Sequence, residues 1–165
     1  FICDPAYGSS KFGTIGMEKL DGIIYVKEAT QYDRPSPSAM TDLITIKAKD
    51  YNNTCLVDSA HPGLIRDLID RGVNTLDVKF GQITENKQSI LSLMTIEAAQ
   101  CVKEKRIRIH PDFHDLVAQM RAVRFNDKGT PDKTELTFDL GDCLLMGCNF
   151  LKSSNIEIVV VHTLD

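Results

Sequence analysis

The stretch TIGMEKLDGIIYVKE, residues 14–28, decides how the chain begins to fold. Its two apolar runs, residues 14–20 and 23–28, are joined by the pair Asp21-Gly22. An Asp-Gly pair between such runs is a strong signal for a β-hairpin, because both residues tolerate the backbone angles of a tight turn. A further short strand is predicted ahead of this hairpin, at residues 2–6. The chain is therefore expected to open as a three-stranded meander.

Helices and strands alternate after this opening. Ser36-Pro37 is a favourable helix start, with Ser as the N-cap and Pro at the first helical position. Helical spacing of apolar residues predicts the other helices, and short apolar runs predict the strands. The predicted helices cover residues 62–71, 86–103, 113–123 and a last segment from Asp139, and the strands cover residues 54–57, 75–80 and 106–109. Residues 126–135 are predicted as a loop, and residues 156–161 form a final apolar run.

This order of elements defines the predicted fold class. It is α/β with a mixed sheet, in which an antiparallel opening meander is followed by alternating strands and helices, with helices on both faces. Such an order is what an RNase H-like fold would show. With 165 residues, the chain fits a single domain over residues 1–165. It begins at Phe1 without a Met, so we expect it to be a piece of a longer polypeptide.

Composition and charge limit the class of protein. The net charge of −4 argues against a domain that binds nucleic acid through a broad basic face. It does not exclude a nuclease, because carboxylates gathered for metal ions are acidic until the ions bind. No apolar run reaches the ~18 residues of a membrane-spanning helix. The five cysteines are odd in number and form no CxxC pair, which favours buried, reduced thiols over disulfides or a zinc site.

Acidic residues lie where predicted elements end or begin. Asp4 ends the first strand, Asp58 ends the apolar run of residues 55–57, and Asp142 lies in the first turn of the last helix, three residues after Asp139. In open α/β sheets, sites gather at strand ends, so residues far apart in sequence can converge there. Two divalent ions ~3.5–4 Å apart can activate a water and stabilise the leaving oxygen of a phosphodiester. Carboxylates are the ligands that Mg²⁺ prefers.

Each acid also has a purely structural interpretation. Asp4 before Pro5 can open a turn, and Asp58-Ser59 can cap the following helix. Asp139 and Asp142 have the spacing of a capping pair, and acids at a helix N-terminus are favourable in any case. Spacing alone therefore leaves the metal site and the structural roles both open.

Cationic and histidine residues supply candidates for substrate binding. Lys105 and Arg106 belong to a basic cluster at residues 103–108, which either contacts the DNA backbone or is a solvated helix end that suits the helix dipole. His61 follows Asp58 closely and can orient a water or a phosphate, unless it is simply an exposed turn residue. Lys11 lies in the loop after the first strand, from which it can reach a scissile phosphate.

Three stretches resemble one protein family. Residues 57–72, VDSAHPGLIRDLIDRG, resemble a stretch of the large terminases of tailed phages in which the Asp ends a central strand and binds metal. Residues 139–145, DLGDCLL, resemble the late stretch that holds the third ligand, and residues 2–8, ICDPAYG, resemble the opening that holds the first. The resemblance implies that Asp4, Asp58 and Asp142 are catalytic metal ligands. Asp139 is an alternative third ligand, a helix cap or a supporting acid.

The resemblance also implies a function and partners. It implies an RNase H-like endonuclease domain that cuts concatemeric double-stranded viral DNA with two divalent ions, Mg²⁺ or Mn²⁺. The expected partners are an upstream ATPase domain of the same chain, the small terminase subunit and the portal, within the host cytoplasm or nucleus and away from membranes. The sequence has no GxxxxGK[ST] phosphate loop, so the ATPase motor is expected upstream of Phe1. The alternatives are an RNase H-like junction resolvase or recombinase, and a non-catalytic interaction module.

Overall fold

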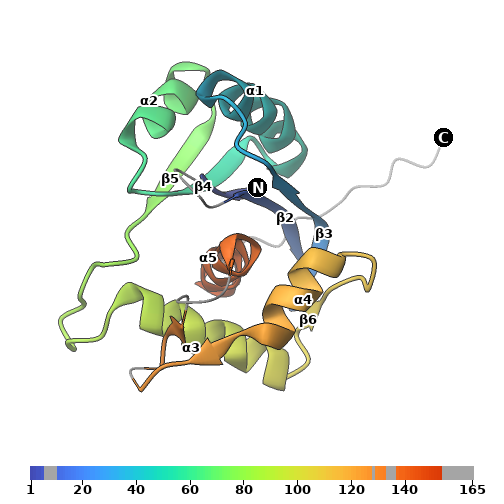
Figure 1. The fold of residues 1–165 in the computed structure, drawn as a ribbon, viewed down its shortest axis with the longest axis vertical. Helices are drawn as coiled ribbons and strands as arrows, with labels where there is room; N and C mark the ends of the chain where they lie inside the picture. Colours follow the sequence, from blue (N-terminus) through green and yellow to red (C-terminus); the bar gives the residue numbers. More distant parts are fainter. Residues whose placement is uncertain (6–10, 128, 133–136, 154–165) are drawn as a thin grey trace.

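The computed structural model describes residues 1–5, 11–127, 129–132 and 137–153. Within these residues, six strands form one mixed sheet in the order β5-β4-β1-β2-β3-β6 (Figure 1). The strands are β1 (Ile2–Asp4), β2 (Phe12–Leu20), β3 (Ile23–Tyr32), β4 (Thr54–Asp58), β5 (Asn74–Val78) and β6 (Ile107–Arg108). β2 is antiparallel to β1 and β3, whereas the other neighbours are parallel. All strands except β2 therefore finish at the same end of the sheet, which we call the carboxyl end.

The predicted hairpin is confirmed. β2 and β3 pair from Leu20↔Ile23 outward, and Asp21 and Gly22 form the turn with φ angles of 50° and 76°. Positive φ at both central residues is what a two-residue hairpin of the type I′ kind requires. The pairing shifts by one residue at a bulge between Gly16 and Met17 and continues to Tyr32, beyond the predicted end of the strand.

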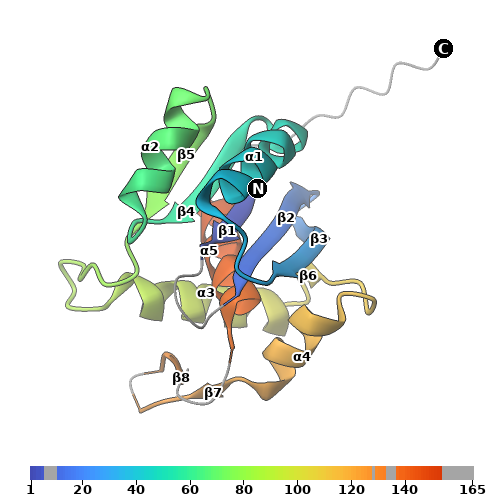
Figure 2. The ribbon, with the colours of Figure 1, turned by 45° about the horizontal axis from the view of Figure 1, so that its top comes forward.

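Helices cover both faces of the sheet, as predicted. α1 (Pro37–Ala48) and α2 (Pro62–Asp70) lie on one face. On the other face, α5 (Asp139–Ser153) packs directly against β1, β2 and β3, and α3 (Ile90–Lys103) and α4 (His114–Ala122) pack against α5 (Figure 2). A 3₁₀ turn, η1 (Lys49–Tyr51), follows α1, and β7 (Arg124–Phe125) pairs with β8 (Pro131–Asp132) inside the segment predicted as a loop.

The sheet separates two hydrophobic cores. Side chains alternate between faces along a strand, so neighbouring residues enter different cores. Ile2, Ile15 and Leu56 pack under α5, whereas Cys3 and Val57 pack under α1 and α2. This alternation fixes which face of the sheet each strand-end acid occupies.

Helix starts follow their caps. The Oγ atom of Ser36 accepts a hydrogen bond from the Ala39 N–H at 3.2 Å, as the Ser36-Pro37 pair predicts. Ser89 caps α3 in the same way by accepting from Ser92, so α3 begins at Ile90, four residues later than residue 86. The apolar run at residues 156–161 lies outside the described residues. None of the described helices is both long and apolar enough to span a membrane.

Candidate active site

Asp4 and Asp58 end two adjacent parallel strands. In the β1–β4 ladder, Cys3 pairs with Val57, so the two acids are the next residues along each strand. Asp4 is two residues after Ile2 and Asp58 is two residues after Leu56, and both apolar residues pack under α5. The two-residue period of a strand therefore places both carboxylates on the α5 side of the carboxyl end. Both residues are partly exposed.

The first turn of α5 lies beside these acids because β2 has a glycine there. Gly13 pairs with Asp4 across the β1–β2 ladder. A Cβ added to Gly13 would lie 2.9 Å from the carbonyl carbon of Asp139, closer than real Cβ contacts allow. The missing side chain thus lets the backbone of α5 reach the sheet next to Asp4. Asp139 and Asp142 in this turn are buried, with 8% and 6% of their surface exposed.

A buried thiol reports the convergence of these acids. Burial is the largest cause that raises the pKa of Cys143 well above its ordinary value, and the nearby carboxylates of Asp4, Asp142 and Asp139 raise it further. The same Sγ atom donates a hydrogen bond to the carbonyl oxygen of Gly13 at 3.4 Å. Carboxylates from β1 and from α5 therefore lie within electrostatic reach of one atom. All five cysteines are free and buried, which confirms the prediction of reduced thiols.

Asp139 is held by hydrogen bonds from the neighbouring strands. Its Oδ2 atom accepts from the backbone N–H of Lys11 at 3.2 Å and from the side-chain amide of Gln31 at 3.3 Å. These bonds join the start of α5 to β2 and β3, and they stabilise the charged carboxylate. Asp142 lies one turn further along α5, and its backbone N–H donates to the Phe138 carbonyl. Asp139 thus has the contacts of an acid that positions the helix.

His61 connects the ends of β1 and β4. Its ring forms a hydrogen bond with the backbone of Pro5, and it lies near the Asp58 carboxylate. Burial lowers the pKa of His61 more than Asp58 and Pro5 raise it, which favours the neutral imidazole. His61 is also the N-cap residue of α2 and makes no side-chain cap, so Asp58 and Ser59 do not cap this helix. Asp58 Oδ1 instead accepts the N–H of Ala60 at 3.0 Å.

The predicted basic residues separate into two locations. Lys11 lies at the carboxyl end, where its Nζ atom is 3.6 Å from Asp33 Oδ1. Lys105 and Arg106 lie just before β6, and the Arg106 carbonyl accepts from the N–H of Ile24 at 2.8 Å. Seven residues of β3 separate Ile24 from the row of Gly13, a distance of about 23 Å at ~3.3 Å per residue. The structure brings Lys11 and His61 to the acids, and it places Lys105 and Arg106 at the opposite end of the sheet.

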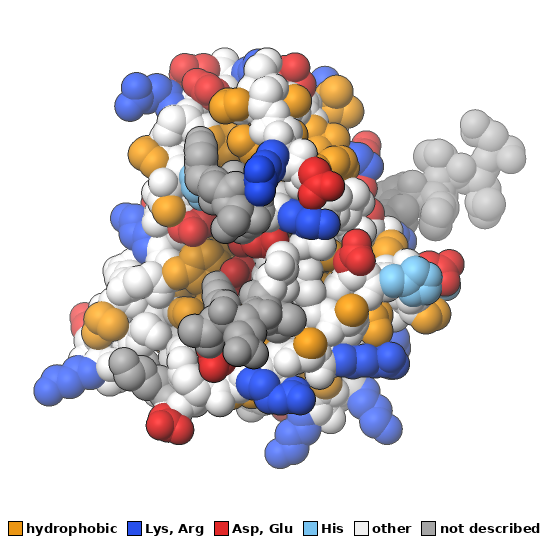
Figure 3. Space-filling view, viewed as in Figure 1, with side chains coloured by type: hydrophobic (Ala, Val, Ile, Leu, Met, Phe, Trp, Pro, Cys, Tyr) orange, Lys and Arg blue, Asp and Glu red, His pale blue; other side chains and the backbone are white. Residues whose placement is uncertain are grey.

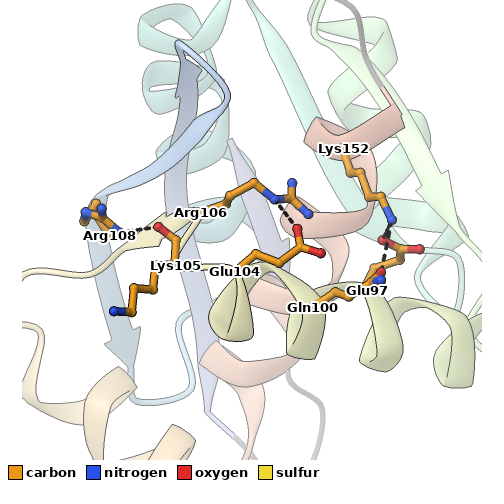
Figure 4. A network of polar contacts seen from close by, with 7 residues as sticks. All are labelled: Glu97, Gln100, Glu104, Lys105, Arg106, Arg108 and Lys152. Carbon is orange, nitrogen blue, oxygen red and sulfur yellow. Dashed lines mark hydrogen bonds and ion pairs between the residues drawn. The ribbon is translucent and has the colours of Figure 1, made fainter.

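The contacts at that opposite end are mostly internal. Arg106 Nε donates to Glu104 Oε2 at 2.6 Å, and Arg108 donates to the Lys105 carbonyl (Figure 4). Nearby, Lys152 of α5 reaches Glu97 and Gln100 of α3. This arrangement matches the solvated helix end that the sequence left open, although it does not test DNA binding.

Gln119 supports the first turn of α5 and was not predicted from the sequence. It is buried in α4, with 7% of its surface exposed, and its Oε1 atom accepts the backbone N–H of Gly141 at 3.1 Å. The first N–H groups of a helix have no partner within it, so an acceptor from a neighbouring helix stabilises the start of α5. A polar residue on the apolar face of α4, beside Leu116 and Met120, is the only sequence signal of this role.

Replacing Gln119 with Met is expected to lower the free energy of unfolding by about 1–3 kcal/mol. Met has a similar length but no oxygen, so the buried N–H of Gly141 would lose its acceptor. Chemical denaturation of both forms measures the change. The matched control is Gln88→Met, at an exposed position, which should change stability by less than ~0.5 kcal/mol. Equal stabilities of the Gln119 and Gln88 variants would contradict the capping role.

The donor set at this site has the chemistry that a divalent ion needs. Asp4, Asp58, Asp139 and Asp142 provide carboxylate oxygens, the hard ligands that Mg²⁺ and Mn²⁺ take. Among the residues that the structure describes, however, no three His, Cys, Asp or Glu side chains are close enough to form a metal-binding group as they stand. The type of ligand therefore fits, whereas a preformed coordination sphere is not present. Figure 3 shows acidic side chains in a hollow near the centre of this face, between the α1–α2 and the α3–α4 parts.

Comparison with known proteins identifies the fold. No protein-family model and no curated protein matches the sequence. The structure is similar to the full-length large terminase of a thermophilic bacteriophage, with a TM-score of 0.66 and 15% identity over 91% of this chain and 38% of that one. This chain therefore spans about two-fifths of that protein.

Isolated nuclease domains match over most of their length. The nuclease domain of the large terminase subunit of bacterial virus Sf6, solved as a mutant with manganese and beta-thujaplicinol, has a TM-score of 0.62 and 15% identity over 89% of this chain and 86% of that one. The human cytomegalovirus terminase nuclease domain has a TM-score of 0.60 and 13% identity, covering 94% and 83%. The chain has the RNase H-like α/β fold of large terminase nuclease domains, as the sequence predicted.

Proposed function

We propose that this chain is the nuclease domain of a viral large terminase subunit, which cuts concatemeric double-stranded DNA during packaging. One observation carries the proposal: acids from β1, β4 and α5 gather at the carboxyl end of a sheet with the fold of terminase nuclease domains. In open α/β sheets, the carboxyl ends of strands are where ligands bind. The identities to the solved domains are low, so the activity rests on this gathering of acids rather than on descent.

Asp4, Asp58 and Asp142 are the proposed ligands of two divalent ions, Mg²⁺ or Mn²⁺. The carboxylates of Asp4 and Asp58 face α5 from adjacent strands, and Asp142 lies in its buried first turn. When bound, the ions would supply a nucleophilic water and stabilise the charge on the leaving oxygen. The Sf6 nuclease domain, which was solved with manganese, supports this choice of metal. Asp139 would act one step away, by fixing the first turn of α5 through its bonds to Lys11 and Gln31.

His61 and Lys11 are the proposed contacts to substrate near the ions. His61 is tied to the Pro5 backbone and is neutral near pH 7, so it can orient a water or a phosphate without adding charge. The Lys11 ammonium is half-exposed and can reach a phosphate at the same end of the sheet. We further propose that an ATPase domain precedes this domain in the full protein. The small terminase subunit and the portal would bring it to DNA at the procapsid, in the host cytoplasm or nucleus.

Millimolar Mg²⁺ or Mn²⁺ is expected to raise the melting temperature of the chain. An ion that binds only the folded state stabilises it by about 2.7 kcal/mol at a concentration of 100 Kd. For a domain of this size, that corresponds to a rise of roughly 5–10 °C. Differential scanning fluorimetry with a metal titration measures the shift. Asp58→Asn should reduce it, whereas Asp70→Asn, on the exposed end of α2, should not. An unchanged melting temperature in both metals would favour a non-catalytic module.

A further inference from the structure

Cationic side chains flank the acids on both sides at the carboxyl end of the sheet. On one side, Lys79 directly follows β5, and Arg66 of α2 lines the same groove. On the other side, Lys11 directly precedes β2, and Arg34 lies two residues after β3. Because the strand order is β5-β4-β1-β2-β3, these four cations lie on either side of the two strands that end in acids. A central acidic row with cations at both ends is therefore built into the topology.

The groove between α2 and β5 leads to the candidate active site. It has a volume of about 500 Å³ and is lined by Ser59, Ile65, Arg66, Ile69, Asp77 and Lys79, among others. Ser59 directly follows Asp58, and its N–H donates to the Val78 carbonyl at 2.9 Å. The groove is thus continuous with the end of β4, where one of the proposed metal ligands lies.

The four cations are available to a polyanion. Lys11 and Lys79 form only loose ion pairs, at 3.6 Å with Asp33 and at 3.7 Å with Asp77, and all four side chains are about half-exposed or more. Exposed pairs of this kind contribute little, so a phosphate can replace the carboxylate.

Arg34 and Arg66 are exposed and form no ion pair with a described residue. Arg34 also has a φ of 42°, a left-handed conformation that is uncommon for a residue other than glycine. Such conformations cost energy and cluster at functional sites. Both guanidinium groups are therefore positioned in solvent, where a phosphate can bind them with two hydrogen bonds.

A polyanion needs these cations because the acids would repel it. Four carboxylates at the site and a net charge of −4 oppose the approach of DNA. From the strand before Lys79 to the strand before Arg34 there are four strand spacings, or about 19 Å at ~4.8 Å each. With one charge per ~3.4 Å along each DNA strand, this width matches roughly five or six phosphates.

We propose that a DNA strand crosses the carboxyl end of the sheet at right angles to the strands. Arg66 and Lys79 bind phosphates on one side of the scissile bond, and Lys11 and Arg34 bind phosphates on the other. This inference rests on the proposed nuclease function and adds the path and the direction of the substrate. It also assigns DNA binding to the carboxyl end rather than to the basic cluster at residues 103–108.

The salt dependence of DNA binding tests this path. The variants are Arg66→Gln with Lys79→Gln, and Lys11→Gln with Arg34→Gln, in the 165-residue chain. Affinity for a 20-base-pair fluorescent duplex is measured by anisotropy between about 50 and 300 mM NaCl, with Ca²⁺ in place of Mg²⁺. Each lost phosphate contact lowers the slope of log affinity against log salt by ~0.9, so each pair should lower it by ~1.8. In plasmid cutting, KM should rise at least about tenfold while kcat changes little.

The control removes two charges elsewhere. Lys27→Gln with Lys103→Gln has the same net charge change but lies away from the carboxyl end, so its slope should equal that of the parent chain. An unchanged slope in both carboxyl-end pairs, or a smaller slope in a Lys105→Gln with Arg106→Gln pair alone, would overturn the path. Loss of the proposed function gives a different result, because then no metal-dependent cutting occurs in the parent chain at all.

Discussion

Asp58→Asn is expected to abolish metal-dependent cutting of plasmid DNA while the fold stays intact. Asn has the same shape, and its Oδ1 atom can still accept the Ala60 N–H, so the local turn after β4 is preserved. The substitution removes only the negative charge that would hold a divalent ion. Loss of one group that stabilises developing charge typically costs ~10²–10³ in rate, and loss of a metal ligand should cost at least that. The measurement is the conversion of supercoiled plasmid to nicked and linear forms in Mg²⁺ or Mn²⁺.

The matched control for this prediction is Asp70→Asn. Asp70 is the last residue of the same α2 that follows Asp58, and its side chain is exposed. An acid at a helix C-terminus is unfavourable, so its removal should leave stability equal or slightly higher and should leave cutting unchanged. Cutting by Asp58→Asn at the rate of the Asp70 variant would exclude Asp58 as a metal ligand.

Local features of the fold were predictable because local chemistry decides them. The Asp21-Gly22 turn adopts the positive φ angles that its two residues favour, and Ser36 caps α1 with its own hydroxyl. The start of α3 was placed too early because apolar spacing does not show a cap, whereas Ser89 ends the extended backbone three residues after Asn86. The short β7–β8 pair was predicted as a loop, since two-residue strands have no periodic pattern.

The candidate site was predictable only in part. Acids at strand ends can be recognised in the sequence, and the parallel β1–β4 pairing places Asp4 beside Asp58. The sequence could not show how α5 approaches the sheet, since this depends on contacts between residues more than 100 positions apart, such as Lys11 with Asp139. It therefore left Asp139 and Asp142 as equal third ligands. The hydrogen bonds to Asp139 now support Asp142 as the proposed ligand.

The basic cluster illustrates the limit of reading charge along the chain. Lys105 and Arg106 are the densest positive region of the sequence, but they precede β6, which runs parallel to β3. They consequently lie at the amino end of the strands, about 23 Å from the row of Gly13 at ~3.3 Å per residue. The cations at the carboxyl end are single residues in separate segments, and only the strand order places them around the acids.

Gly13→Ala is expected to separate the first turn of α5 from Asp4 and to inactivate the chain. The new methyl group would lie 2.9 Å from the Asp139 carbonyl carbon and 3.0 Å from its oxygen. These are backbone atoms, which cannot rotate away as the end of a side chain can, so the turn itself must move. Overpacking of this kind costs ~1–3 kcal/mol of stability. A displacement of about 1 Å in a catalytic group can cost ~10²-fold in rate.

The control for this prediction is Gly63→Ala in α2, where the added Cβ would meet no atom within 4 Å. Ala is favoured over Gly in a helix by up to ~1 kcal/mol, so this variant should be as stable as the parent chain or more so, with full cutting activity. For Gly13→Ala, circular dichroism and melting establish whether the chain still folds, and plasmid cutting establishes whether the acids still act together. A folded Gly13→Ala protein with full activity would show that the acids of α5 are not needed beside Asp4. Metal ligation would then have to come from the strand ends alone.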